Sequence, residues 1–475
     1  MSNGFLRCEG DKVVDGKGNP VVLRGAALGG WMNMENFITG YPAHEFQHRA
    51  AMLQVLGQEK YEFFFDKFLE YFFMEADAKF FASLGLNCIR LPFNYKHFED
   101  DMNPRVLKES GFKHLDRVID LCAKENIYTI LDMHTVPGAQ NPDWHSDNPS
   151  NYAAFWDHKD HQDRTIWLWE QIATRYKDNQ WVAGYNPINE PCDPKHYRLP
   201  AFYNRLEPAI RKIDPNHILW LDGNTFAIEW KFFENVLPNC AYALHDYSQQ
   251  GFPGFERFKG TPDQLDKLEK QFLRKAEFQQ QRKCVAWNGE FGPVYSDPRM
   301  DSDADEINQE RYNLLGAQLS IYEKHQIPWS IWLYKDIGVQ GMVYTDPDGF
   351  WKKTIQPFLE KKRQLQIDAW GRYPSKQVEE VISPLVKWID SVCPEAKNNY
   401  PTNWATERQI IRLTLQTFVA NSFSVEFASL FKDMSLEQLD EAAKSFRFDK
   451  CLQREGLNKI MSEHAKATKK AAAGN

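Results

Sequence analysis

The sequence has no run of about 18 uncharged apolar residues, the length that a membrane-spanning helix requires. Its first residues, MSNGFLRCEGDKVV, lack the apolar core of a secretion signal. Its eight cysteines are scattered without CxxC spacing, which is typical of reduced thiols in the cytosol. These absences predict a cytoplasmic protein that makes no stable insertion into membranes.

An excess of positive charge is also absent. The chain has 57 Lys and Arg against 65 Asp and Glu, a formal net charge of -8, and no basic stripe interleaved with aromatic residues. Because phosphate binding needs clustered Lys and Arg, this balance predicts no nucleic-acid partner. The phosphate-binding patterns GxGxxG and GxxxxGK are absent too, which disfavours an open doubly wound sheet.

Aromatic residues, in contrast, are abundant. The chain has 15 Trp, 19 Tyr and 33 Phe, and 43% of its residues are apolar or aromatic. Core packing accounts for most of these rings, and rings that lie flat against a sugar would account for others. The composition therefore predicts a globular protein with a large core, built as one big domain or two smaller ones.

Short β-branched or apolar runs alternate with longer segments of helical period, the pattern of a parallel sheet flanked by helices. The eight runs are 21–27, 86–93, 128–134, 182–190, 217–223, 240–247, 284–292 and 327–336. The helical segments between them are 59–83, 112–126, 160–178, 200–213, 263–281 and 304–325. Eight strand–helix units predict an α/β fold, a (β/α)8 TIM barrel with loop insertions.

The two ends of the chain add to this barrel. Turn residues Asp15-Gly16 and Gly18-Asn19 predict an N-terminal β-hairpin at its lower end. After residue 368 the strand runs stop, so we expect a catalytic domain over 1–368 and a helical C-terminal extension over 369–475 that packs on the barrel. Ser435 and Gln438 form the pattern of a capping box.

The C-terminal extension carries apolar residues that something must cover. They are Ile410, Leu413, Leu415, Phe418, Phe423 and Phe427. A structural or an oligomeric role fits them equally, and the sequence leaves the oligomeric state open.

Catalytic groups of (β/α)8 barrels gather at the C-terminal ends of the strands, so polar residues that end the apolar runs are candidates. A lone buried Glu or His is usually a satisfied core group, but a shared position at one rim indicates a functional site, because burying several ionisable groups together is costly. The candidates are Arg90, Asn94, His134, Asn189, Glu190, His245, Tyr247, Glu290 and Trp332.

Two of these candidates are acids, Glu190 on the fourth run and Glu290 on the seventh. A carboxylate pair about 5–5.5 Å apart is what a retaining glycosidase requires, one acid to attack the anomeric carbon and one to protonate the departing oxygen. The two acids need opposite protonation states, so the nucleophile needs a cation and hydroxyl donors nearby. Arg90 and Tyr247 are the donors available.

The chain resembles glycoside hydrolase family 5, a group of retaining (β/α)8 glycosidases. The resemblance covers about residues 5 to 365, and the matching residues stand in the family's order on its strands. They are Arg90, His134, Asn189-Glu190-Pro191, His245-Asp246-Tyr247, Gly289-Glu290-Phe291-Gly292 and Trp332.

The resemblance implies a role for each matching residue. Glu190 is implied as acid/base and Glu290 as nucleophile, without a metal or an organic cofactor. Around them the family pattern implies that Asn189 binds the sugar 2-hydroxyl, Tyr247 supports Glu290, Arg90 keeps Glu290 ionised, His134 and His245 contact the sugar in subsite −1 or the two carboxylates, and Trp332 forms the floor under that sugar.

Two segments resemble the exo-β-1,3-glucanase branch of the family. They are GGWMNMENFITGYP (29–42) and PGAQNPDW (137–144). The first implies that Glu35 binds hydroxyls of a terminal sugar in a pocket that closes behind a single glucose. The sequence departs from the branch at Asn36, at Trp287-Asn288 and at the LYKD that ends the eighth run.

These features predict a retaining, exo-acting β-glucosidase-like hydrolase that releases terminal β-linked glucose from small glucosides or oligosaccharides by double displacement. Three alternatives stay open: an endo-β-glucanase, a hydrolase of glycolipids or disaccharide glycosides, and a sugar-binding barrel without catalysis. A binding protein gains nothing from two mutually repelling acids, which disfavours the last.

Two further segments have a functional and a plain interpretation. His158 and His161 have the spacing of a metal pair, but the charged residues around them favour the solvated start of a helix. The Phe-rich segment 61–81 could lie on a membrane surface, but acidic residues interrupt its apolar face, which favours core packing.

Overall fold

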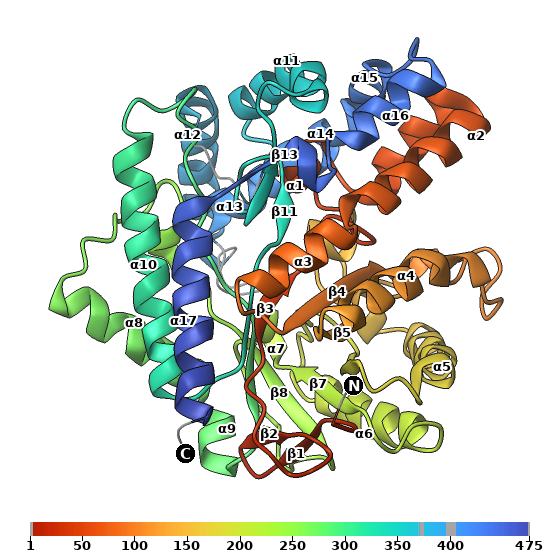
Figure 1. Cartoon of the computed structure of the whole chain (residues 1–475). Helices are drawn as coiled ribbons and strands as arrows, with labels where there is room; N and C mark the ends of the chain where they lie inside the picture. Colours follow the sequence, from red (N-terminus) through yellow and green to blue (C-terminus); the bar gives the residue numbers. More distant parts are fainter. Residues whose placement is uncertain (1–2, 369, 371–374, 396–404, 474–475) are drawn as a thin grey trace.

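Eight parallel strands form a closed barrel in the computed structural model, which describes residues 3–368, 370, 375–395 and 405–473 (Figure 1). Around the barrel the order is β10-β3-β4-β5-β6-β7-β8-β9. The strands are β3 (Arg24–Ala27), β4 (Cys88–Asn94), β5 (Tyr128–Thr135), β6 (Val182–Asn186), β7 (Ile218–Asp222), β8 (Cys240–His245), β9 (Ala286–Glu290) and β10 (Trp329–Ile331). Each strand lies within a predicted run or overlaps one, so the predicted (β/α)8 fold is confirmed.

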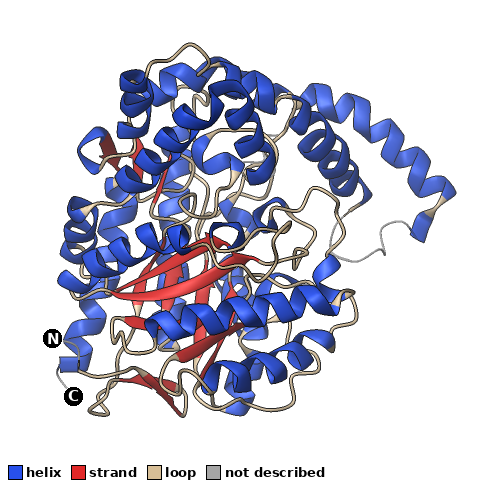
Figure 2. Ribbon diagram, turned by 90° about the vertical axis from the view of Figure 1, so that its right-hand side faces the viewer, coloured by secondary structure: helices blue, strands red, loops and turns tan. Residues whose placement is uncertain are grey.

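Helices surround the strands on the outside of the barrel (Figure 2). They are α2 (Glu45–Phe72), α3 (Glu75–Ser83), α4 (Phe112–Lys124), α5 (Lys159–Tyr176), α6 (Arg198–Arg211), α8 (Pro262–Lys275), α9 (Glu277–Arg282), α10 (Ala304–Lys324) and α11 (Phe350–Gln364). The predicted single helix over 59–83 is wrong: α2 begins at Glu45, and α3 is separate. Gly57, with a φ of 74°, interrupts α2 and hides its full length from a periodicity search.

The N-terminal hairpin closes the lower end of the barrel. Strands β1 (Arg7–Glu9) and β2 (Lys12–Val14) pair antiparallel through a turn at Gly10 that was not predicted. The predicted turn at Asp15-Gly16 and Gly18-Asn19 follows β2 and is confirmed, because Val14 pairs antiparallel with Pro20 across it. Asp15 forms a second turn, in which its Oδ1 accepts hydrogen bonds from the backbone N–H groups of Lys17 and Asn19. Beneath the barrel, Leu6 and Val13 pack with inward side chains of the barrel strands.

The eighth predicted run divides between two sheets. Its first part is β10, whereas β11 (Lys335–Asp336) pairs with β12 (Val343–Thr345) outside the barrel. A third strand, β13 (Cys451–Gln453), pairs antiparallel with β12. The prediction of helices alone after residue 368 is therefore wrong. A strand of three residues is too short to show a periodic pattern in the sequence, and it forms because it pairs with the edge of an existing sheet.

The C-terminal extension, residues 369–475, is otherwise helical where it is described. Its elements are α12 (Lys376–Val392), α13 (Thr406–Ile411), the π-helix η7 (Arg412–Val419), α14 (Ala420–Ser422), α15 (Ser424–Ser429), α16 (Leu436–Lys444) and α17 (Glu455–Ala473). Helices α15 and α16 pack on α2, and α17 packs on α10. The capping box of α16 is confirmed, since Ser435 and Gln438 exchange two hydrogen bonds. The division of the chain at residue 368 stays a prediction.

The Phe-rich segment 61–81 packs in the core, so the interpretation as a core helix is confirmed. Phe64 contacts Phe431, and Phe68 contacts Phe446, with ring centroids 6.2 and 5.0 Å apart. These contacts join α2 to the C-terminal extension. No helix among the described residues carries an apolar stretch long enough to cross a bilayer.

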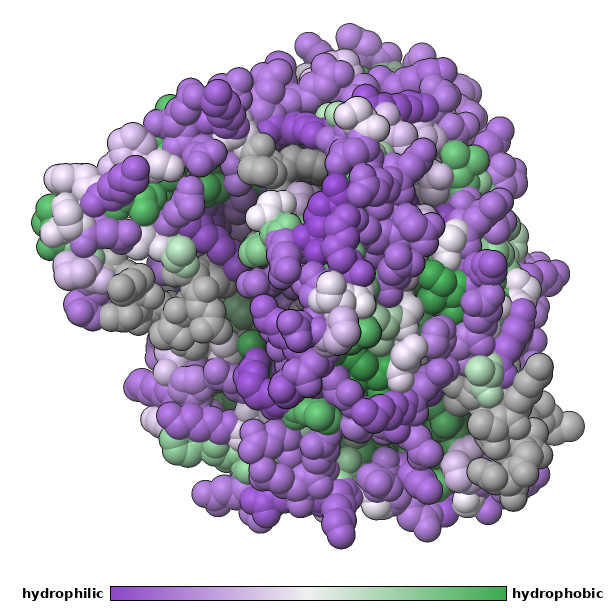
Figure 3. Space-filling model, turned by 90° about the vertical axis from the view of Figure 1, so that its left-hand side faces the viewer, coloured by the Kyte–Doolittle hydropathy of each residue, from purple (hydrophilic) through white to green (hydrophobic). Residues whose placement is uncertain are grey.

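The rest of the chain covers some of the apolar residues of the extension and leaves others exposed, and an oligomeric role for these stays a prediction. Phe427 is fully buried, but Phe418 and Leu413 are 75% and 41% exposed, and Trp388 on α12 is 65% exposed. Among the described residues, α12 and α13 pack against each other through Val378, Ile382 and Ile411, and Trp388, Leu413 and Phe418 point away from that contact. On the side shown in Figure 3 the surface is mostly hydrophilic, with small hydrophobic patches.

Candidate active site

The two predicted acids meet at the C-terminal end of the barrel. Glu290 is the last residue of β9, and Glu190 follows β6 by four positions. The predicted run 182–190 included Asn189 and Glu190. Strand β6 ends at Asn186, so both residues lie in the loop after the strand. Glu190 adopts a left-handed φ of 46°, a strained conformation for a residue with a side chain. Its backbone N–H donates to Asp222 Oδ2 at 2.9 Å, which fixes this turn.

Two histidines contact the carboxyl group of Glu190. His245 Nδ1 lies 2.6 Å from Oε1, and His145 Nε2 lies 3.1 Å from Oε2. Burial raises the pKa of Glu190 to about 7, repulsion from Glu290 adds to the rise, and His145 opposes it. Glu190 is thus an acid that can hold its proton near neutral pH.

Glu290 has the opposite environment, with a cation and a hydroxyl donor. Arg90 Nη1 lies 2.5 Å from Oε1, and the Tyr247 hydroxyl donates to Oε2 at 2.9 Å. The fully buried Arg90 also donates to Asn189 Oδ1 at 2.6 Å and forms an ion pair with Asp132 at 3.0 Å. A carboxylate that accepts charge-assisted hydrogen bonds is stabilised in its ionised form.

The acids are close to each other. One ligand atom each of Glu190, His245 and Glu290 lies within 4.8 Å of the others. Carboxyl groups of retaining glycosidases are about 5–5.5 Å apart and those of inverting ones about 6.5–9.5 Å, so this proximity fits the retaining arrangement. The three side chains could also hold a cation, but Arg90 already neutralises Glu290 on one side. That the enzyme uses no metal and no cofactor stays a prediction.

The remaining predicted residues form one wall of the same site. The rings of His134 and Trp332 stack with centroids 5.3 Å apart and 14° between their planes. Glu35 Oε1 lies 3.5 Å from His134 Nε2, and Asn189 Nδ2 lies 3.2 Å from the same nitrogen. Gly29 is needed beneath this wall, since a Cβ there would come within 2.6 Å of the Trp332 ring.

The structure thus brings together every predicted site residue except Asn94. They are Glu35, Arg90, His134, Asn189, Glu190, His245, Tyr247, Glu290 and Trp332. Asn94 is not part of this group, because its amide donates to Glu45 and Asp147. His158 precedes the first residue of α5, in agreement with the helix-start interpretation.

Sequence reasoning missed the contribution of the segment between β5 and α5, residues 136–158, here called the β5 loop. Besides His145, it supplies Trp144, whose Nε1 donates to Glu35 Oε2 at 3.3 Å. Asn141 donates to the backbone oxygen of Glu190 at 2.9 Å. The sequence offered one indication of this role, because the segment PGAQNPDW (137–144) resembles a loop of the exo-β-1,3-glucanase branch. His145 directly follows that segment.

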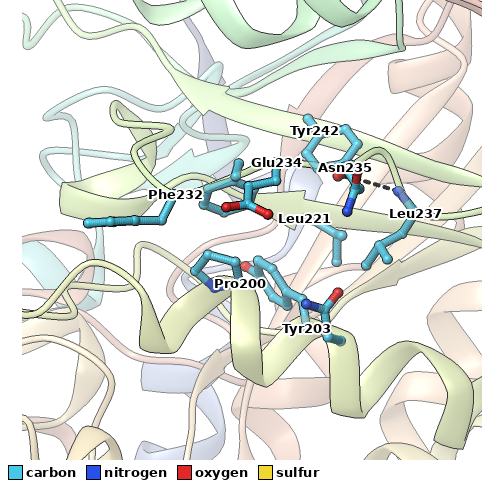
Figure 4. A pocket seen from close by; sticks show the side chains of 10 residues that line it. Pro200, Tyr203, Leu221, Phe232, Glu234, Asn235, Leu237 and Tyr242 are labelled. Atoms are coloured by element: carbon cyan, nitrogen blue, oxygen red, sulfur yellow. Dashed lines mark hydrogen bonds between the residues drawn. The ribbon is translucent and has the colours of Figure 1, made fainter.

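A separate small pocket lies outside the barrel, between α6 and the segment before β8 (Figure 4). Its volume is about 70 Å³, below the roughly 300–1,000 Å³ of ligand pockets. Tyr203, Phe232 and Tyr242 line it together with Glu234. It has no pair of acids and does not compete with the strand-end site.

A closed (β/α)8 barrel with two acids in contrasting environments at its strand ends defines the class of barrel glycosidases. The chain matches the family described as Cellulase (glycosyl hydrolase family 5) over residues 57–338. The chain belongs to glycoside hydrolase family 5, and it is an O-glycoside hydrolase.

Among its relatives, a protein of Phanerodontia chrysosporium named Beta-xylosidase is 55% identical over 97% of this chain and 98% of its own. Endoglucanase C of Acetivibrio thermocellus is 26% identical over 58% and 88%. A probable glucan 1,3-beta-glucosidase A of Emericella nidulans is 30% identical over 45% and 55%. The crystal structure of an endogalactoceramidase shares the fold, with a TM-score of 0.51 and 17% identity over 70% of this chain and 75% of that chain.

Proposed function

We propose that the chain is a retaining, exo-acting β-glucosidase-like hydrolase that releases a terminal β-linked sugar from small glycosides or oligosaccharides. The observation that carries the proposal is the contrast between the two acids. Glu290 accepts hydrogen bonds from Arg90 and Tyr247, whereas the pKa of Glu190 is raised to about 7. Double displacement needs this division of protonation states.

In the first step, a carboxylate oxygen of Glu290 forms a bond to the anomeric carbon as the glycosidic bond breaks. Glu190 gives its proton to the departing oxygen, and a covalent glycosyl-enzyme remains. In the second step, Glu190 takes a proton from water, whose oxygen attacks the anomeric carbon and releases Glu290. The sugar leaves with its original β configuration.

The residues around the acids have supporting roles in this proposal. Arg90 and Tyr247 stabilise the carboxylate of Glu290, and Asn189, which Arg90 orients, is placed for the sugar 2-hydroxyl. His134, Trp332 and Glu35 bind the terminal sugar, and His245 positions Glu190. We add His145 as a second positioning residue for Glu190, because its Nε2 faces the other carboxyl oxygen.

Xylose is the second candidate for the released sugar. It is favoured by the relative named Beta-xylosidase, which is 55% identical over nearly the whole chain. Xylose differs from glucose only in lacking the hydroxymethyl group on C5, so a site of this kind could accept either ring. Initial rates on a panel of aryl β-glycosides, with the β-glucoside and the β-xyloside side by side, decide between them.

The role of Glu290 is tested by Glu290→Gln. We expect kcat to fall by several orders of magnitude while the protein stays folded, because the amide cannot form the glycosyl-enzyme. Near-normal rates on an aryl β-glycoside would show that the assignment is wrong.

The stereochemical course is tested with Glu190→Ala, an activated aryl β-glycoside and azide. Azide replaces water in the second step, so we expect a β-configured glycosyl azide. An α-configured product would exclude retention.

Exo-action is tested on a short β-linked oligosaccharide. Monosaccharide as the first product supports a pocket for a chain end, and longer first products would support an endo-glucanase instead. A glycolipid substrate and a disaccharide glycoside are compared in the same assay. If no glycoside is turned over, the result would support the alternative of a sugar-binding barrel without catalysis.

A further inference from the structure

Two described residues of the C-terminal extension, Trp370 and Arg412, contact loops on the substrate side of the barrel. The indole of Trp370 contacts the ring of Tyr247, with centroids 4.8 Å apart and planes at 83°, and that of Phe252 at 4.9 Å and 78°. It also lies 6.1 Å from the rings of Trp144 and Phe37. Tyr247 in turn donates to Glu290, the proposed nucleophile.

These four partners come from loops on different sides of the barrel mouth. Tyr247 and Phe252 follow β8, Trp144 follows β5, and Phe37 lies in α1 (Asn36–Thr39), which follows β3. In the closed barrel, β8 is three strands away from β5 in one direction and from β3 in the other. One ring can contact loops so placed only if it lies over the mouth that they surround.

Trp370 is also held toward the catalytic strands by a hydrogen bond. Its Nε1 donates to Oε1 of the buried Gln340, whose Nε2 donates to the backbone oxygen of Gly292 at 3.2 Å. Gly292 follows Glu290 by two positions. These hydrogen bonds therefore connect the indole of Trp370 to the end of β9, the strand that carries Glu290.

Arg412 holds the β5 loop itself, at the residue before Trp144. It begins the π-helix η7, a rare element that is often found at functional sites. Its Nη2 lies 3.3 Å from Asp143 Oδ1, and both side chains are buried. Burial alone would raise the pKa of Asp143, but Arg412 and His145 more than offset it and lower the pKa below its usual value. Asp143 directly precedes Trp144 and His145, the β5-loop residues that contact Glu35 and the carboxyl group of Glu190.

We infer that the C-terminal extension completes the substrate pocket, with Trp370 as its outer wall and Arg412 as the anchor of the β5 loop. A wall over the mouth leaves room for the end of a sugar chain or a small glycoside, and it obstructs a polymer that must extend on both sides of the cut. The inference rests on the proposed function and deepens it, since it assigns chain ends and small glycosides as the substrate class.

Trp370→Ala in the full-length enzyme tests the wall. We expect kcat/KM on an aryl β-glycoside to fall by roughly tenfold or more, mainly through a higher KM, because an aromatic contact with the substrate is lost in ground state and transition state alike. Trp370→Phe should recover most of the loss. Trp388→Ala, a matched change on the 65%-exposed tryptophan of α12, should leave kcat/KM within about twofold.

The result that overturns the wall is a folded Trp370→Ala with kcat/KM and KM within about twofold of the parent enzyme. If Trp370→Ala does not fold, Trp370→Phe and Trp370→Leu decide instead: a graded rise in KM from Phe to Leu supports the wall, and equal KM values overturn it. Glu290→Gln separates the two proposals. An inactive Glu290→Gln beside an unchanged Trp370→Ala contradicts this inference alone.

A double-mutant cycle tests the anchor. Arg412→Gln and Asp143→Asn should each lower kcat/KM, and the double variant should be about as active as the weaker single one, because both changes remove one interaction. Losses that multiply in the double variant would show that the two residues act independently and would overturn the anchor.

Discussion

At the scale of the residue, the site depends on unequal surroundings for two acids of the same kind. Arg90, fully buried, faces Glu290, whereas the carboxyl group of Glu190 faces the imidazole rings of His145 and His245. The proton of Glu190 is therefore governed by burial, by Glu290 and by His145. The pH dependence of the enzyme should therefore follow from the contacts of Glu190 with Glu290 and His145.

The pH profile is predicted from these contacts. Glu190 must be protonated to act as acid, and its raised pKa is about 7, so kcat/KM should fall about tenfold per pH unit above that value. In His145→Ala a group that lowers the pKa of Glu190 is lost, so this alkaline limb should move to higher pH. Profiles are measured on a glycoside with a poor leaving group. A limb that stays in place would contradict the role of His145.

At the scale of the element, a buried ion pair joins strands and helices behind the site. Lys335 of β11 is fully buried, and its Nζ lies 2.6 Å from Asp77 Oδ1 on α3. The same ammonium donates to the backbone oxygens of Phe72 and Phe446, at 2.7 and 2.8 Å. One side chain thus connects the end of α2, α3 and the segment after α16.

Lys335→Met is expected to lower the free energy of unfolding by about 3–5 kcal/mol, because it leaves the buried Asp77 carboxylate without its partner. Urea unfolding followed by circular dichroism gives the value. The control is Lys324→Met, which breaks an exposed pair with Glu269 and should cost about 1 kcal/mol or less. Equal losses in the two variants would argue against a structural role for the buried pair.

At the scale of the whole molecule, the barrel and the C-terminal extension share one core. Phe431 and Phe446 of the extension pack on Phe64 and Phe68 of α2, and β13 adds a strand to the sheet of β11 and β12. Removing the extension would expose these apolar rings and an open strand edge, both of which favour aggregation.

A chain ending at residue 368 is therefore expected to be insoluble or to lose its cooperative thermal unfolding transition, although it contains every predicted acid and site residue. A chain ending at residue 467 is the control and should unfold as the full-length protein does. Calorimetry and size-exclusion chromatography make the comparison. A soluble 1–368 chain with a full transition would show that the barrel is an independent domain.

Sequence reasoning reached the site through patterns that are local in the chain. Glu190 and Glu290 stand out because each charged residue ends an apolar run, and the order of the runs places both at one end of the barrel. Sequence reasoning failed where the pattern of an element is short or interrupted. Strand β13 has only three residues, and Gly57 breaks the helical period of α2. The turn at Asp15-Gly16 was predicted correctly, whereas the earlier turn at Gly10 was not predicted.

The sequence by itself determined the family, the number and order of the barrel strands and the two acids with their partners on the strands, because these follow from local periodicity and from residues at strand ends. Only the tertiary structure decided that His145 faces Glu190, that Trp370 lies over the barrel mouth and that Arg412 anchors the β5 loop. These contacts join loops far apart in the chain. Their encounter depends on how the barrel closes and where the extension packs, and no short stretch of residues encodes that.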